Sequence, residues 1–136
     1  MEKMLRQFAC FLLWAGLGTF TAFLAGSILS TPGQAQTTEK QGKELYEKRC
    51  GGCHAMDRDK EGPRLGGVYG RAAAKVASFE YSAALQKSQI VWTDETLNKW
   101  LTDPDKLVPD NDMPFHVESA DERREIIAYL KQLAGK

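Results

Sequence analysis

Two cysteines separated by two glycines and followed at once by a histidine constrain this chain more than any other feature. The pentapeptide is Cys50-Gly-Gly-Cys53-His54, and it matches the C-x-x-C-H pattern of c-type haem attachment. Two thiols at this spacing can each add to one haem vinyl group, and the thioethers then fix the ring in the chain. The adjacent imidazole reaches the iron. We therefore predict one haem c, bound covalently through Cys50 and Cys53, with His54 as an iron ligand.

Three other interpretations of the pentapeptide are weaker. A thioredoxin-like redox pair belongs between a strand and a helix, but the residues just upstream, 40–49, are rich in helix formers. A zinc site needs four suitably spaced ligands, and the only histidine outside the pentapeptide is the distant His116. A disulfide would close a very small loop and leave His54 without a role.

The amino-terminal quarter of the chain predicts an export signal. No charged side chain occurs between Arg6 and Glu39, and two basic residues precede the apolar stretch 8–29, as in a secretory signal. Small residues, Gly33 and Ala35, suit a cut after Ala35. We therefore divide the chain into an export signal, residues 1–35, and a mature domain, residues 36–136. An uncleaved anchor is the alternative, because a spanning helix needs about 20 residues.

The mature chain would have 101 residues, with 16 basic and 17 acidic side chains. A chain of this length forms one domain with a modest core, which a bound cofactor would help to stabilise. Its charges are interspersed, so electrostatics give no reason to expect a nucleic-acid partner or an anionic membrane surface. We expect a monomer that touches a membrane only if the anchor is retained.

Few residues could occupy the second axial position of the iron. The candidates are Met56, Met113, His116 and the lysines. Met56 lies two residues beyond His54, a reach of about 7 Å, and cannot pass round the haem to the opposite face. Met113 is favoured, because prolines on both sides stiffen its segment into a loop that could present one thioether, whereas a core methionine would sit among apolar neighbours on a helix. His116 stays open as an alternative ligand or a docking residue.

Further motifs follow the pentapeptide in a fixed order. They are Gly62-Pro-Arg-Leu-Gly-Gly-Val-Tyr-Gly-Arg71, Phe79-Glu-Tyr81-Ser82, Trp92, Val108-Pro109, Met113 and Ile127-Ala-Tyr129-Leu130. In this order they resemble the class I c-type cytochromes, and in particular the short soluble carriers that include mitochondrial cytochrome c and its periplasmic bacterial relatives. The resemblance runs from about residue 42 to residue 133. It implies an all-α single domain of about four to five short helices wrapped around one covalently bound haem.

The resemblance also assigns roles residue by residue. It makes His54 and Met113 the axial ligands, and it makes the carbonyl of Pro63 the acceptor for the second nitrogen of His54. Haem propionates are costly to bury without partners, and three side chains would donate hydrogen bonds to them: Arg71, Tyr81 and Trp92. The glycines within 62–71 would let the backbone approach the flat macrocycle.

Two departures from the family pattern stand out. Trp100 occupies a position where relatives usually have a tyrosine whose hydroxyl approaches the ligand sulfur. An indole donates through its one N–H from a different distance and direction, so we expect Trp100 to pack on the haem and leave its contact with the sulfur open. The second departure is the haem edge, where relatives display lysines. Here the comparably placed cations are Lys48, Arg49 and Lys106, while the acidic residues nearby are Asp110, Asp112 and Glu118.

The hydrophobic pattern predicts helices over about 39–49, around 82–87, from Thr93 to Asp103, and from a capping box at Ser119 to near Gly135. No strand signal competes. The family resemblance implies that the first helix crosses the last at Gly42 and Tyr46, so Tyr46 and Tyr129 are expected in the core.

These observations predict a periplasmic one-electron carrier, not an enzyme, that exchanges electrons with transient redox-protein partners. An iron with both axial positions filled has no open site for a substrate. The alternative function is a haem-bearing subunit or sensor with a labile sixth ligand that binds a small molecule. A third possibility keeps the same haem domain as a membrane-tethered relay.

Overall fold

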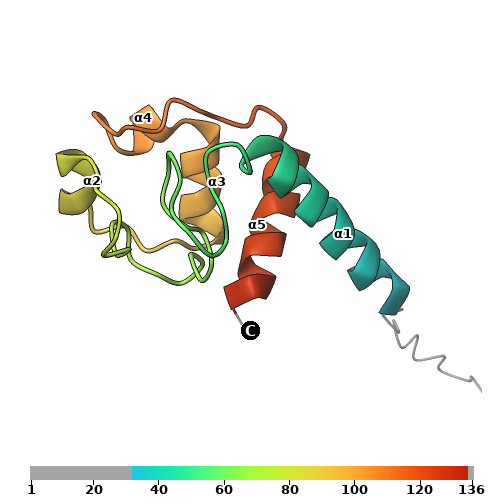
Figure 1. The fold of residues 1–136 in the computed structure, drawn as a ribbon. Helices are drawn as coiled ribbons and strands as arrows, with labels where there is room; N and C mark the ends of the chain where they lie inside the picture. Colours follow the sequence, from blue (N-terminus) through green and yellow to red (C-terminus); the bar gives the residue numbers. More distant parts are fainter. Residues whose placement is uncertain (1–31, 135–136) are drawn as a thin grey trace, which may run out of the picture.

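The computed structural model describes residues 32–134, with side-chain surroundings for residues 40–134. Five helices make up this part of the chain (Figure 1): α1 (Pro32–Arg49), α2 (Ala83–Lys87), α3 (Asp94–Thr102), α4 (Pro104–Leu107) and α5 (Ala120–Ala134). Within the described residues the only β pairing is an isolated bridge between Ala72 and Val91. The predicted all-α fold is confirmed.

The start of the first helix and the presence of a short fourth helix differ from the prediction. The first helix begins at Pro32 and not near Glu39, because a proline fits the first turn of a helix, where its missing N–H is not needed. The short α4 was not predicted, since Pro104 was interpreted only as the end of α3. The Asp103 side chain accepts a hydrogen bond from the Lys106 amide (3.0 Å) and so caps a new turn that starts at the proline.

The crossing of α1 over α5 is the most extensive helix contact among the described residues (Figure 1). A Cβ atom placed on Gly42 would lie 2.7 Å from the carbonyl oxygen of Glu125 and 2.8 Å from Cβ of Tyr129. Both separations are shorter than atoms tolerate, so only glycine allows the two backbones to approach this closely. One turn further along, the rings of Tyr46 and Tyr129 pack with their centroids 5.7 Å apart.

Tyr46 is a core residue as expected, and Tyr129 is half-buried. The Tyr46 hydroxyl is buried and has no hydrogen-bond partner within the described part of the chain. Its burial, with a smaller contribution from Cys50, raises the pKa of this phenol to about 12. The ring therefore stabilises the crossing through its apolar surface.

The start of α5 is tied to the end of α1. The hydroxyl of Ser119 accepts a hydrogen bond from the Glu122 amide (3.3 Å), so half of the predicted capping box is present. The other half is absent, because the Glu122 carboxylate binds the Arg49 guanidinium through two bonds of 2.9 and 3.0 Å. A planar guanidinium matches a carboxylate in this way, and the pair holds the residue just before Cys50.

The third helix forms one wall of the interior. Thr93 and Thr96 cap it reciprocally, and its buried residues are Leu97, Trp100 and Leu101. The amide of Val117 donates to the carbonyl of Leu101 (2.7 Å), which secures the segment that leads into α5.

No helix in residues 32–134 is long and apolar enough to cross a bilayer. Residues 1–31 of the expected export signal lie outside the described residues. The expected cut after Ala35 falls within α1.

Candidate haem site

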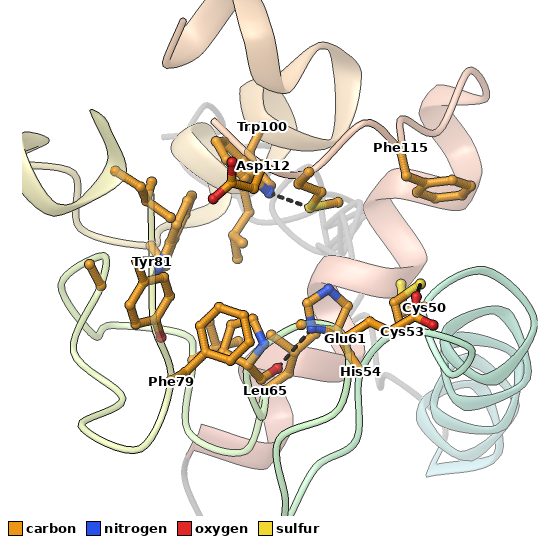
Figure 2. A pocket seen from close by; sticks show the side chains of 18 of the residues that line it. Cys50, Cys53, His54, Glu61, Leu65, Phe79, Tyr81, Trp100, Asp112 and Phe115 are labelled. Atoms are coloured by element: carbon orange, nitrogen blue, oxygen red, sulfur yellow. Dashed lines mark hydrogen bonds between the residues drawn. The ribbon is translucent and has the colours of Figure 1, made fainter. Parts of the chain in front are cut away.

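All nine residues that the sequence nominated line one cavity of about 330 Å³ (Figure 2). Its wall is mainly apolar and comes from the end of α1, the connection from 50 to 82, α3 and the segment before α5. The volume lies at the lower end of the range of about 300–1,000 Å³ found for small-molecule and cofactor sites. The nominated lining residues are Cys50, Cys53, His54, Pro63, Arg71, Tyr81, Trp92, Trp100 and Met113.

The two thiols lie together at one side of the cavity (Figure 2). Cys50 directly follows α1, and its amide still donates to the carbonyl of Tyr46 (2.8 Å), so the helix fixes its position. Both cysteines are free thiols. Burial raises the pKa of Cys50 to about 11, and a hydrogen bond from Cys53 to the Glu61 carboxylate (3.4 Å) raises the pKa of Cys53. Both sulfurs therefore carry their protons at neutral pH in the protein without haem.

One nitrogen of His54 is already occupied by the backbone. Its Nδ1 lies 2.8 Å from the carbonyl oxygen of Pro63 (Figure 2). A carbonyl only accepts, so Nδ1 carries the proton and Nε2 keeps its lone pair free. Burial lowers the pKa of the imidazole, which favours the neutral form that binds metals. The contact with Pro63 that the family resemblance implied is present.

The glycines of the 62–71 segment also make room for neighbouring parts of the chain. A Cβ on Gly62 would lie 2.2 Å from Cε1 of His54, and a Cβ on Gly66 would lie 2.3 Å from the carbonyl oxygen of Met56. Gly67 and Gly70 have positive φ angles of 63° and 81°. These glycines therefore make room for the imidazole and for the preceding backbone, or allow left-handed turns.

The indole of Trp100 reaches the sulfur of Met113. Its Nε1 lies 3.1 Å from Sδ, and the N–H donates to the thioether. Trp100 is buried, and it packs at 64° against the ring of Trp92, with centroids 5.3 Å apart. The family tyrosine has thus been replaced by a different donor to the same sulfur, a contact that the sequence left open.

The loop that carries Met113 is held by Asn111, which sequence reasoning missed. The Asn111 side chain accepts a hydrogen bond from the Met113 amide (2.8 Å) and donates to the carbonyl of Val108 (3.0 Å) and to Asp105 (2.7 Å). Asp110 adopts a φ of 63°, a left-handed conformation that aspartate tolerates better than most residues. The available signal was an asparagine in a polar turn between two prolines.

Backbone pairing brings two of the three expected propionate donors, Arg71 and Trp92, together on the cavity wall, which Tyr81 also lines. The amide of Trp92 donates to the carbonyl of Arg71 (3.0 Å). The guanidinium of Arg71 donates two hydrogen bonds, to the carbonyls of Gly66 and Arg64. The hydroxyl of Tyr81 accepts a hydrogen bond from the Val76 amide (3.3 Å). The indole N–H of Trp92 donates to no protein acceptor in the described residues, so it is free to donate a hydrogen bond to a carboxylate.

The donor set fits a covalently bound haem. Two free thiols, an imidazole with a free Nε2, a thioether and an apolar wall surround one cavity. The described residues contain no group of three or more His, Cys, Asp or Glu side chains that could hold a zinc ion. They also contain no strand–helix unit of the kind that carries a thioredoxin-like pair.

Comparison with known proteins gives the same class. The family described as cytochrome c matches residues 39–134. Cytochrome c of Euglena viridis is 43% identical over 97 residues, covering 69% of this chain and 95% of the relative. Cytochrome c 2.1 of Caenorhabditis elegans is 41% identical over 100 residues, covering 71% and 90%. Among solved structures, cytochrome cH from Methylobacterium extorquens superposes with a TM-score of 0.65 at 34% identity, covering 69% of this chain and 97% of that one.

The all-helical fold and the thiol–imidazole site define a class I c-type cytochrome. The chain belongs to the cytochrome c family. It is accordingly an electron carrier that works through transient contacts with redox partners, and its cofactor is haem c, attached through Cys50 and Cys53.

The space behind His54 yields a first prediction. Gly62→Ala forces a methyl group into the imidazole, so the ring or the loop must shift in a closely packed interior. We expect a lower yield of haem-loaded protein and an altered ferric absorption spectrum. Gly52→Ala is the matched control, because a Cβ at that position meets nothing within 4 Å. Unchanged yield, spectrum and thermal stability in Gly62→Ala would show that His54 does not need this space.

Proposed function

We propose that the chain is an exported one-electron carrier whose haem iron is held between Nε2 of His54 and the sulfur of Met113. One observation carries the proposal: each candidate ligand side chain is held by a hydrogen bond, and the two groups that hold them lie on opposite sides of the cavity. Figure 2 shows His54 bonded to the backbone on one side and Trp100, the donor to Met113, on the other.

The donor set suits reversible electron transfer. Bound haem supplies an iron that alternates between the ferric and ferrous states. A thioether opposite an imidazole favours the ferrous state relative to two nitrogen ligands and so raises the reduction potential. If His54 and Met113 both bind the iron, no coordination site would remain for oxygen or a substrate. Buried side chains on the wall, Leu97 and Trp92 among them, keep water from the interior.

Trp100 positions the thioether. The N–H engages one of the two sulfur lone pairs and leaves the other for the iron. It also withdraws electron density from the sulfur, which adds to the preference for the ferrous state. Trp100 is itself held by the edge contact with Trp92, so the donor and the sulfur form a rigid unit.

Haem propionates would be placed near Arg71, Tyr81 and Trp92. Trp92 has a free N–H, and burial lowers the pKa of Arg71 without discharging it. A carboxylate partner would compensate this partly buried cation. The hydroxyl of Tyr81, which accepts from Val76, still has a proton to donate.

Export accounts for the apolar amino terminus. Removal of residues 1–35 would leave a chain that starts at Gln36 and keeps the α1 residues at the crossing, Gly42 and Tyr46. The charge pattern of residues 1–35 is that of a secretory signal, and the periplasm is the corresponding compartment. The mature protein would be a monomer there, in contact with a membrane only if the segment is retained.

The ligand assignment is tested by Met113→Ala. Loss of the thioether should lower the midpoint potential, abolish the absorption band of sulfur bound to ferric iron, and allow rapid carbon monoxide binding to the ferrous protein. Met56→Ala is the control and should leave all three unchanged, because Met56 cannot reach the opposite face of the haem. Rapid carbon monoxide binding to the unmodified ferrous protein would instead support the sensor function with a labile sixth ligand.

The role of Trp100 is tested by replacing the indole with a ring that has no donor. Trp100→Phe should lower the midpoint potential and increase the affinity of the ferric protein for added imidazole, since the sulfur becomes easier to displace. Trp100→Tyr restores a donor and should recover part of both changes. If Trp100→Phe changes stability alone, the indole only fills space.

Processing is tested by sequencing the amino terminus of protein recovered from its own host. We expect Gln36 as the first residue, in the periplasmic fraction. An intact Met1 in protein that stays with the membrane after a salt wash would establish the tethered form.

A further inference from the structure

The segment that carries Met113 to the cavity has an excess of carboxylates. The segment 103–118 joins α3 to α5 and includes the Met113 loop, and Asp112, Pro114 and Phe115 within it line the cavity (Figure 2). We call this segment the acidic rim. Its acidic residues are all exposed, and none forms an ion pair within the described residues. They are Asp103, Asp105, Asp110, Asp112 and Glu118.

Few cations offset this charge. Within the acidic rim, the only lysine or arginine is the exposed Lys106. From α5, the guanidinium of Arg123 donates to the carbonyls of Val117 and Glu118 (2.7 and 2.8 Å) and so adds one positive charge beside Glu118. The acidic rim and its neighbour Arg123 therefore carry five carboxylates and two cations. The rim is net negative by three charges.

The other side of the mouth has charged residues of both signs. Arg49 lines the cavity, but its charge is matched by the bidentate contact with Glu122. Glu61 also lines the cavity and is adjacent to Lys60 in sequence. The lining also includes the partly buried Arg71, and the exposed Lys48 lies next to Arg49. The mouth is therefore polarised, because its unmatched negative charge lies on the acidic rim and its unmatched positive charge lies on the other side.

An exposed aromatic ring accompanies the charge. Phe115 is 38% exposed and lines the cavity. The other large exposed hydrophobic residue among the described ones, Val91, is not part of the lining. An apolar contact bordered by charges of one sign is the composition of a protein-docking site, in which charge steers the encounter and the apolar group supports close approach.

We propose that the acidic rim with Phe115 is the electron-transfer docking surface and that it selects a redox partner whose own docking face is rich in lysine and arginine. This inference rests on the proposed carrier function and adds the chemical class of its partner. Opposite charges raise the encounter rate, and the rise diminishes as salt screens them. A partner with an acidic face would be repelled by Asp110 and Asp112.

Two inorganic oxidants of opposite charge test the sign of this surface. Ferrous haem-loaded protein is oxidised in a stopped-flow instrument by tris(phenanthroline)cobalt(III), charge 3+, and separately by hexacyanoferrate(III), charge 3−, over a range of ionic strength. In the unmodified protein, salt should slow the cobalt reaction and accelerate the hexacyanoferrate reaction. The variant is Asp112→Asn, and the control is Glu95→Gln. Glu95 carries the same charge on the first turn of α3, at the end of that helix remote from the acidic rim (Figure 1).

The ratio of the two rate constants is the decisive quantity. A change in midpoint potential moves both oxidation rates in one direction, whereas a local charge moves them in opposite directions. At low ionic strength, Asp112→Asn should slow the cobalt reaction by about fivefold and accelerate the hexacyanoferrate reaction by about fivefold, as expected for one charge about 8–10 Å from a trivalent ion. Glu95→Gln should change the ratio much less.

Two outcomes would overturn the proposal: an equal effect of Asp112→Asn and Glu95→Gln on the ratio, or a faster hexacyanoferrate reaction after addition of a negative charge by Phe115→Asp. Failure of the His54–Met113 assignment would be recognised separately. In that case the unmodified protein would lack the absorption band of sulfur bound to ferric iron, whereas the ratio of the two rate constants would be unaffected.

Discussion

The close crossing of α1 and α5 at Gly42 sets the position of everything that binds the cofactor. The backbone of α1 continues directly into the pentapeptide, since the amides of Cys50 and Gly51 both donate to the carbonyl of Tyr46. The first thiol is therefore fixed as firmly as the helix, and the helix is fixed by its contact with α5. Arg49 and Glu122 fasten the same junction with a bidentate pair. A side chain at position 42 would separate the helices and move the attachment point with them.

The two proposed ligands are supported in different ways. His54 lies between a backbone carbonyl and a glycine, and neither can turn away without a change in the chain path. Met113 lies on a loop held by the side chains of Asn111 and Trp100. Side-chain contacts break with less rearrangement than backbone ones, so local opening of the site is easier on the methionine side. Ligand exchange at the iron would begin there.

Much of this architecture could be read from the sequence because it is local. The pentapeptide, the stiff segment around Met113 and the helix starts at Ser82 and Thr93 each follow from residues close together in the chain. The nine nominated residues, which all line one cavity, could be named because the family motifs occur in the same order in this sequence. Their roles toward the haem stay predictions.

The features that could not be read depend on choices between partners. Glu122 could close a capping box or bind Arg49, and the distant guanidinium wins because it offers two charged bonds. Asp103 could end α3 or begin α4, and it does both. The contact of Trp100 with Met113 needed the separation between α3 and the loop, which no periodicity encodes. Asn111 was missed because a turn asparagine bonds to its own backbone in many loops.

The donor at the sulfur also determines what accompanies the electron. A phenol can exchange its proton with water and can reverse its role from donor to acceptor, whereas an indole N–H does neither near neutral pH. Because Trp100 is buried and bonded to the thioether, the charge that arrives at the iron is not balanced by hydrogen movement at this contact. At this contact, reduction of the iron would not be coupled to uptake of a proton, so Trp100 would add no pH dependence to the reduction potential.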